Sequence, residues 1–375
     1  MDSDHKTFMP RPCDDADELL SLYNASDMAF NGEKKMDAAR SFAVKHLKLI
    51  STVGRIERAE LKNVINWWAR LDLGKTLSFS RNRLIECFFY VVGIVHGPDS
   101  GFCREKLTQV GMLIATVDDV YDIYGSLEEL ELFTQIIDRW DMKDMIKLPD
   151  YMKICFSTLN DLITEVASQL SLNDRLEVMP YLKRAWADLF KTFLVEAKWC
   201  KDRYIPTLKE YLPIATLSAS GHVILLHTYV LLKCKITKET LQQLQDFPNI
   251  IRLPSLIFRL CNDLATSSEE RDRGETAIAV QCYMNEEGAS EEEARMYVSV
   301  LISDAWKEMN REYFTCSYYS KFPQQFIDAS INLARMASFM YQHGDGFSSP
   351  GHQVKASIIS LLLNSTSTNL RERDL

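Results

Sequence analysis

Apolar residues recur at helical spacing along most of this chain. They fall three and four residues apart, which places them on one face of an α-helix. Segments with this pattern include 15–23, 33–50, 56–73, 127–140, 182–199, 256–269 and 291–311. No alternating stretch around Asn-Gly or Asp-Gly indicates a hairpin. The pattern predicts an all-α bundle with a central cavity.

Short proline and glycine signals separate the helical segments. Expected boundaries include Pro149, Pro206, Pro213, Pro248, Pro254 and Pro323. The interruption SASG, at Ser218–Gly221, differs because it lies between two apolar helical stretches. Such a break either aims backbone amides and carbonyls into a cavity or is an ordinary turn between helices.

Three carboxylates end an uncharged, apolar run at residues 110–117: Asp118, Asp119 and Asp122. Asp118 and Asp122 share a face if the helix continues, and Gly125 then ends it. Clustered negative charge at a helix C-terminus is unfavourable, but a bound hard cation reverses the penalty, and Mg²⁺ prefers carboxylate oxygens. The cluster is therefore either a Mg²⁺ site or a solvated acidic helix end.

A second oxygen-rich face follows in the segment NDLATSSEE. Asn262, Thr266 and Glu270 are spaced four and four, so they line one helical face. An amide, a hydroxyl and a carboxylate favour Mg²⁺ or Mn²⁺ over zinc. Alone, the segment is equally compatible with an ordinary polar helix face. Together with the acidic cluster, it predicts a metal site that binds a diphosphate between two helices.

Arginines near both segments suit an anionic ligand. Arg81 and Arg83 precede an apolar helix, and Arg259 lies three residues before Asn262. Guanidinium groups bind phosphate oxygens in a fork. Each arginine, taken singly, is also compatible with a surface salt bridge.

Composition narrows the class of protein. The 375 residues carry a net charge of −9, which argues against a nucleic-acid partner. Nine cysteines without a CxxC pair indicate reduced thiols rather than structural zinc. The chain has no run of 18 apolar residues, so we expect no membrane span. Its first residues show neither a signal sequence nor a transit peptide.

The motifs DDVYD, NDLATSSEE and SRNRLIECFFYVVGI resemble those of plant class I terpene synthases of the monoterpene type. The resemblance implies the helical bundle of this class, with Mg²⁺, expected as three ions, or Mn²⁺ as cofactor. The metal ligands it implies are Asp118, Asp119, Asp122, Asn262, Thr266 and Glu270, with Asp119 in a supporting role. The diphosphate contacts it implies are Arg81, Arg83, Asp118, Asp122, Arg259 and Asn262.

The chain also departs from the family pattern. Residues 1–52 resemble only the tail of the family's N-terminal helical domain, and 53–375 resemble the catalytic domain without its first helices. Asn82 replaces the usual acid between the two arginines. Ile278 stands where many monoterpene synthases carry a lysine that contacts the diphosphate. The missing helices are expected to expose core surface and part of the pocket wall.

The implied reaction ionises geranyl diphosphate and releases a monoterpene and diphosphate. Tyr90 and Tyr341 are candidates for stabilising the carbocation with their ring faces, and a loop at Asp345 is expected to help exclude water. Gly111 lies where isoprene-forming members carry a bulky aromatic, so a ten-carbon substrate is preferred. We expect a monomer, located in the plastid by family resemblance but in the cytoplasm if the chain is complete as given.

Three other interpretations stay open. The missing helices permit a catalytically impaired pseudoenzyme or a non-catalytic helical protein. A synthase acting on another prenyl diphosphate, for a sesquiterpene, diterpene or isoprene, shares the motifs. A prenyl-chain elongase shares the metal chemistry, but it would carry a second DDxxD motif in place of NDLATSSEE.

Overall fold

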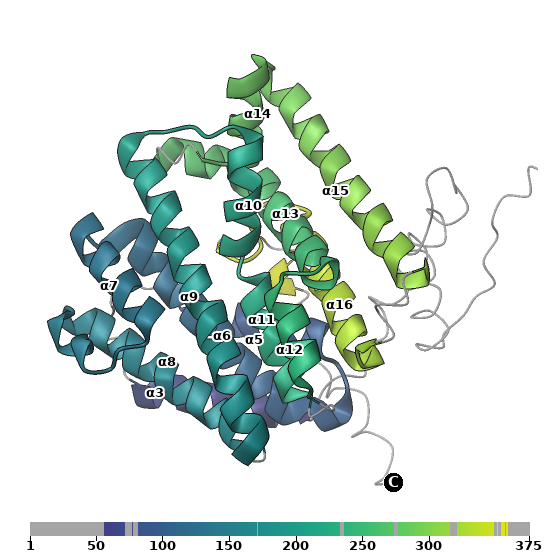
Figure 1. The fold of residues 1–375 in the computed structure, drawn as a ribbon. Helices are drawn as coiled ribbons and strands as arrows, with labels where there is room; N and C mark the ends of the chain where they lie inside the picture. Colours follow the sequence, from purple (N-terminus) through teal and green to yellow (C-terminus); the bar gives the residue numbers. More distant parts are fainter. Residues whose placement is uncertain are drawn as a thin grey trace, which may run out of the picture.

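The chain folds into a helical bundle (Figure 1), which confirms the predicted all-α class. The computed structural model describes residues 56–71, 77, 82–170, 172–232, 236–273, 277–315, 321–348, 351, 354–356 and 358. The predicted N-terminal remnant, 1–52, lies outside these residues. In the described part, the β-structure is limited to one isolated bridge between Gln342 and Gly344.

Thirteen α-helices and three short turns of other helical types form the described fold. The α-helices are α3 (Ile56–Leu71), α5 (Leu84–Ile94), α6 (Gly101–Asp119), α7 (Leu127–Arg139), α8 (Asp150–Ser168), α9 (Leu172–Asp202), α10 (Leu208–Ser218), α11 (Gly221–Leu231), α12 (Lys238–Gln245), α13 (Asn249–Arg273), α14 (Ala279–Glu287), α15 (Glu291–Thr315) and α16 (Gln324–Tyr341). The short turns are Pro98–Ser100, Val120–Tyr124 and Asp144–Lys147.

Helix α13 lies at the centre of one half of the bundle, between α16 and α15. Helices α5 and α6 pack together, and α9 packs against α7, α10 and α11. One apolar core joins most of these helices. A smaller cluster, centred on Tyr211, Leu260, Cys282 and Val298, binds α10, α13, α14 and α15 to one another.

A buried ion pair fastens α3 to this core. Arg104 of α6 is fully buried and bonds both carboxylate oxygens of Glu60 at 2.7 Å. Its remaining nitrogen donates to the carbonyls of Val95 and Gly97, just beyond α5. Arg104 therefore ties α3, α5 and α6 together, and its planar fork satisfies several buried acceptors at once.

Two of the expected proline boundaries are wrong. Pro213 lies inside α10 and Pro254 lies inside α13. A proline has no backbone N–H to bond the carbonyl four residues earlier. In α13 the carbonyl in question belongs to Ile250, and the Ser330 hydroxyl of α16 donates to it at 2.5 Å. A neighbouring helix thus replaces the lost bond and lets α13 continue.

The interruption predicted at Ser218–Gly221 is confirmed. Helix α10 ends at Ser218, and Ser220 has a left-handed backbone, with φ of 63°. A Cβ added at Gly221 would lie 2.3 Å from the hydroxyl oxygen of Ser255 in α13 and would collide with it. Glycine therefore permits the close packing of α11 against α13. Leu208–Leu231 is long and apolar enough to cross a membrane, but 78% of its most apolar window is buried inside the bundle.

Candidate active site

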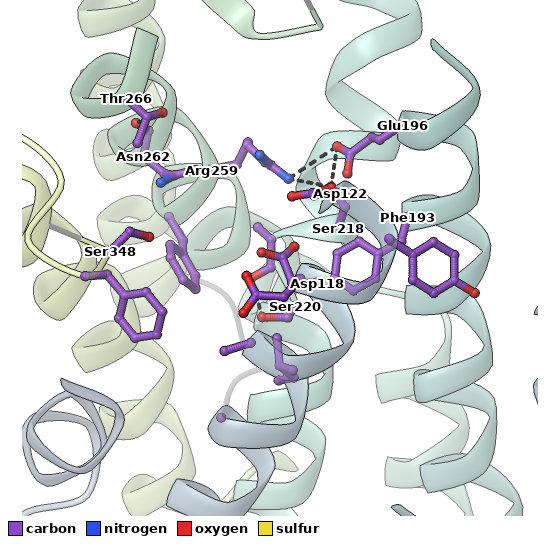
Figure 2. A pocket seen from close by; sticks show the side chains of 18 of the residues that line it. Asp118, Asp122, Phe193, Glu196, Ser218, Ser220, Arg259, Asn262, Thr266 and Ser348 are labelled. Atoms are coloured by element: carbon purple, nitrogen blue, oxygen red, sulfur yellow. Dashed lines mark hydrogen bonds and ion pairs between the residues drawn. The ribbon is translucent and has the colours of Figure 1, made fainter. Parts of the chain in front are cut away.

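A single cavity of about 480 Å³ contains most of the predicted site residues. Helices α5, α6, α9, α11, α13 and α16 surround it, together with the α10–α11 break and the loop after α16. Its apolar lining includes Ile94, Leu107, Ile114, Ile224 and Phe258. Its polar lining combines carboxylates with arginines (Figure 2). The predicted central cavity is therefore present.

The acidic cluster lies where the helix changes type. Helix α6 ends at Asp119, and Val120–Tyr124 forms one turn of π-helix, closed by a 2.8 Å bond from the Gly125 amide to the Val120 carbonyl. Asp118 and Asp122 both line the cavity, and Asp122 is exposed at its mouth. Asp119 also borders the cavity but is fully buried. A wider turn at a functional site is a recurrent use of π-helix.

The chain after this turn is fixed by a capping box. The Ser126 hydroxyl accepts from the Glu129 amide at 3.4 Å, and the Glu129 carboxylate accepts from the Ser126 amide at 3.0 Å. This reciprocal pair begins α7 directly after Gly125. The π-turn therefore has a defined exit, which fixes the position of Asp122.

The second oxygen-rich face lines the same cavity from α13. Asn262 and Thr266 lie among its lining residues. The Thr266 hydroxyl donates to the Asn262 carbonyl at 2.9 Å, which leaves its lone pairs available to a cation. Glu270 lies further along α13, and its side chain is outside the described part.

These donors fit a hard divalent cation. Asp118, Asp122, Asn262 and Thr266 offer only oxygen, which suits Mg²⁺ or Mn²⁺. Among the described residues, no group of three or more His, Cys, Asp or Glu side chains gathers tightly enough to hold a metal. The site thus consists of two separated half-sets on facing helices. Such an arrangement suits metal ions that a diphosphate helps to bind.

Arg259 is held in a network that the sequence did not predict. Its Nη2 donates to the Ser218 hydroxyl at 2.6 Å and contacts Glu196 at 3.2 Å, and its Nε donates to the Ala215 carbonyl at 3.0 Å (Figure 2). Its Nη1 lies 3.6 Å from Asp263. Four partners from three helices therefore fix this guanidinium at the cavity wall.

Asp263 is a further residue that the spacing of the motif did not single out. It is fully buried, and its Oδ2 accepts from the Tyr211 hydroxyl at 2.8 Å and from the Ala279 amide at 3.0 Å. Burial raises the pKa of this carboxyl despite the nearby Arg259 guanidinium. Its contacts join α13 to α10 and to the start of α14, beside Ile278 in the cavity wall.

Of the predicted arginine pair, Arg83 lies in the described part of the chain. Arg83 lines the cavity, and its buried Nε has no hydrogen-bond partner among the described residues. Asn82 precedes the N-cap residue Arg83, and its side chain accepts from the Leu84 amide at 3.2 Å, at the first position of α5. Arg81 lies outside the described part of the chain.

An aromatic wall faces the apolar side of the cavity. Tyr90 and Phe258 have ring centroids 5.6 Å apart, and Phe258 and Tyr341 stack at 6.1 Å. Both tyrosines are buried, and burial raises the pKa of each phenol well above its usual value. The phenols therefore stay neutral. The π faces of the rings are the part of these side chains that can attract a cation.

Asp345 lines the cavity but also organises its own loop. Its Oδ1 accepts from the amides of Phe347 and Ser348 at 3.0 and 2.7 Å. Gly344 has φ of 100°, and a Cβ at Gly346 would meet the Met340 carbonyl at 2.1 Å. The glycines therefore permit the tight loop that brings Asp345 and Ser348 to the cavity.

Comparisons of this sequence with known proteins all indicate the same family. Residues 69–308 match the terpene synthase family, metal binding domain. The chain is 41% identical over 406 positions to myrcene synthase, chloroplastic, of Quercus ilex, covering 94% of this chain and 68% of that protein. It is 44% identical over 306 residues to terpineol synthase, chloroplastic, of Nicotiana alata, covering 82% of this chain and 55% of that protein.

Solved structures give the same fold. A limonene synthase with 2-fluorolinalyl diphosphate has a TM-score of 0.81 at 32% identity, covering 94% of this chain and 75% of that one. The isoprene synthase of grey poplar, in complex with three Mg²⁺ ions and dimethylallyl-S-thiolodiphosphate, has a TM-score of 0.79 at 37% identity. That match covers 93% of this chain and 76% of the poplar chain.

The alignment length also bears on the predicted missing helices. Coverage of 94% corresponds to about 353 of the 375 residues, whereas the alignment with myrcene synthase has 406 positions. About 50 aligned positions therefore carry no residue of this chain. The loss of the first catalytic-domain helices stays a prediction.

Proposed function

Because this chain belongs to the terpene synthase family, we propose that it is a Mg²⁺-dependent synthase that ionises geranyl diphosphate and releases a monoterpene and diphosphate. The observation that carries this proposal is that Asp118, Asp122, Asn262 and Thr266 line one cavity with Arg83 and Arg259. Opposed oxygen ligands flanked by guanidinium groups suit a metal-bound diphosphate better than any other ligand class.

In the proposed reaction, the two half-sets orient the diphosphate of the substrate toward the polar end of the cavity. Asp118, Asp122, Asn262 and Thr266 would hold Mg²⁺, which, when bound, would neutralise the charge that builds on the leaving diphosphate. Arg83 and Arg259 stabilise the same charge by hydrogen bonding. The allylic C–O bond then breaks without a protein nucleophile, and the carbocation faces the wall formed by Tyr90, Phe258 and Tyr341.

The apolar part of the cavity supports a ten-carbon chain. Gly111 lines it, where a Cβ would already lie 3.3 Å from the Cys87 sulfur. A larger side chain here would reduce the space below Asp118. The names of the myrcene, terpineol and limonene synthases denote monoterpenes, and geranyl diphosphate is the matching proposed substrate.

The compartment and the oligomeric state are proposed from different grounds. The myrcene and terpineol synthases are named as chloroplastic, and we propose the plastid for this protein. A monomer is proposed because the described residues of one chain suffice to surround the cavity. Size-exclusion chromatography with light scattering tests the second point, and a dimer would contradict it.

The test of the proposed function is direct. Purified protein is incubated with Mg²⁺ and geranyl diphosphate, and volatile products are identified by gas chromatography. We expect a monoterpene that disappears with EDTA and in Asp118→Ala, whereas Asp161→Ala, exposed on α8, retains activity. Retained turnover in Asp118→Ala would refute the metal assignment.

The second candidate is a catalytically impaired protein. The roughly 50 aligned positions without a counterpart favour this alternative, because helices near the pocket are expected to be among them. No product from geranyl diphosphate, and none from dimethylallyl, farnesyl or geranylgeranyl diphosphate, would establish it. A product from one of the other diphosphates would instead correct the substrate.

A further inference from the structure

Arg259 is engaged by a protein carboxylate inside the cavity. Glu196 of α9 and Arg259 of α13 both line it, with side chains that are only 18% and 15% exposed. The Ser218 hydroxyl lies between them: it accepts from Arg259 at 2.6 Å and donates to Glu196 at 2.6 Å. Figure 2 shows Arg259 reaching from α13 toward Glu196 and Ser218.

Glu196 and Ser218 present to Arg259 the kind of oxygen acceptors that a phosphate group would present. A guanidinium binds carboxylates and phosphates through the same N–H donors and the same geometry. Breaking a buried ion pair is costly unless a replacement anion is supplied. Arg259 can therefore move toward a ligand in the cavity only if that ligand replaces the oxygen atoms of Glu196 and Ser218.

We infer that Glu196, acting through Ser218, is a positioning residue that occupies Arg259 as an internal substitute for the diphosphate in the substrate-free protein. Diphosphate binding then exchanges one anion for another at Arg259. Ser218 is the last residue of α10, directly before the break at Ser220. The exchange therefore also changes the hydrogen bonds that hold one edge of the α10–α11 break.

The inference rests on the proposed function only in taking diphosphate as the anion. It is tested without turnover, by titrating inorganic pyrophosphate in EDTA and measuring heat. In Glu196→Gln we expect affinity roughly tenfold higher than in the original protein, the factor that corresponds to one charge-assisted hydrogen bond. Ser218→Ala, which alters no charge, is expected to bind about threefold tighter, a smaller gain because the direct contact between Arg259 and Glu196 at 3.2 Å remains.

Two controls separate this exchange from a general change in the field of the cavity. In the Arg259→Gln background, Glu196→Gln should give no gain, because its effect passes through Arg259. Thr216→Val removes another α10 hydroxyl, whose one bond within the described part of the chain is to the Leu212 carbonyl at 2.6 Å, and should leave affinity unchanged. Circular dichroism and thermal unfolding verify that each variant is folded.

Each alternative outcome overturns the inference. Undetectable pyrophosphate binding by Glu196→Gln would show that Glu196 is not what keeps Arg259 from binding pyrophosphate. An equal gain in the Arg259→Gln background would show a long-range electrostatic effect. Weaker binding by Ser218→Ala would show that Ser218 holds Arg259 toward the ligand. Because no prenyl diphosphate is consumed, a catalytically inactive protein can still support the inference, and an active one can still contradict it.

Discussion

The hydroxyl of Tyr211 donates a 2.8 Å hydrogen bond to Asp263, and neither side chain is exposed to solvent. This bond crosses from α10 to α13 one residue away from Asn262, a predicted metal ligand. Asp263 also contacts Arg259 at 3.6 Å. One buried carboxylate thus links the predicted metal face, the predicted diphosphate arginine and the helix that leads to the α10–α11 break.

Replacing Tyr211 by phenylalanine should destabilise the protein. The variant leaves Asp263 buried with one donor fewer, and we expect the free energy of unfolding to fall by about 1–3 kcal/mol. Urea denaturation followed by circular dichroism measures the change. Tyr204→Phe is the matched control, because Tyr204 is exposed and bonds Glu210 at 3.2 Å, so its loss should cost under about 0.5 kcal/mol. Equal losses in the two variants would contradict a special role for Asp263.

Tyr90 offers a contrasting prediction. Its buried hydroxyl has no hydrogen-bond partner in the described part of the chain, so Tyr90→Phe should leave the free energy of unfolding unchanged or raise it by up to about 1 kcal/mol. Product formation should persist, because the ring face is retained, whereas Tyr90→Ala should reduce it strongly. Tyr229→Phe loses a 2.7 Å bond to Thr240 and should be destabilised by about 1 kcal/mol. A comparable loss in Tyr90→Phe would mean that its hydroxyl is bonded in solution.

Gly111 should control the length of the substrate. Gly111→Phe places a ring beside Cys87 below Asp118, and we expect the ratio of ten-carbon to five-carbon turnover to fall at least tenfold. Gly111→Ala, whose Cβ needs only a small shift of the Cys87 sulfur at 3.3 Å, should keep the original preference. Product analysis with geranyl and dimethylallyl diphosphate gives both rates. An unchanged ratio in Gly111→Phe would place the chain-length limit elsewhere.

Two buried histidines predict sensitivity to acid. Trp186 donates to His227 at 3.4 Å, and the ring of His222 bonds the Ala185 carbonyl at 3.0 Å. Burial lowers the pKa of both imidazoles to about 4 from 6.5. The unfolded chain therefore takes up protons before the folded one does. The stabilisation that depends on the two neutral imidazoles is complete above pH 6.5. It is lost as pH falls toward 4, by roughly 3 kcal/mol for each histidine.

The measurement is the free energy of unfolding at several pH values between 4 and 7. His227→Gln should show a shallower dependence on pH than the original protein, since one of the two groups no longer titrates. If the original protein and His227→Gln lose stability in parallel, the buried imidazoles do not control the acid response.

The sequence predicted those parts of the site that depend on spacing along one helix. Asn262 and Thr266 face the cavity because four residues make about one helical turn, and a glycine and two serines marked the break at Ser220. The partners of Arg259 on α9 and α10 were not predictable in this way. Glu196 is 63 positions from Arg259, and no spacing within one helix relates the two. Contacts between distant segments depend on packing, which local patterns do not contain.

Asp345 and the Pro213 and Pro254 boundaries illustrate two further limits. The sequence suggested a catalytic role for Asp345, which stays a prediction, and the structure adds that its carboxylate binds two amides of its own loop. The prolines were expected to end helices, yet Ser330 supplies the bond that Pro254 removes. Both features depend on backbone hydrogen bonds, and residue types alone do not determine where those bonds go.

The π-turn at Val120–Tyr124 makes the acidic motif sensitive to length as well as to composition. A π-turn holds one residue more than an α-helical turn, so deleting one residue would allow ordinary α-helical bonding while the residues after the turn keep nearly the same direction. If the lost residue were Val120 or Tyr121, Asp122 would stand three positions after Asp118 instead of four, although every aspartate of the motif was still present. Chains related to this one should therefore tolerate substitution of the exposed Ile123 far better than the loss of Val120 or Tyr121.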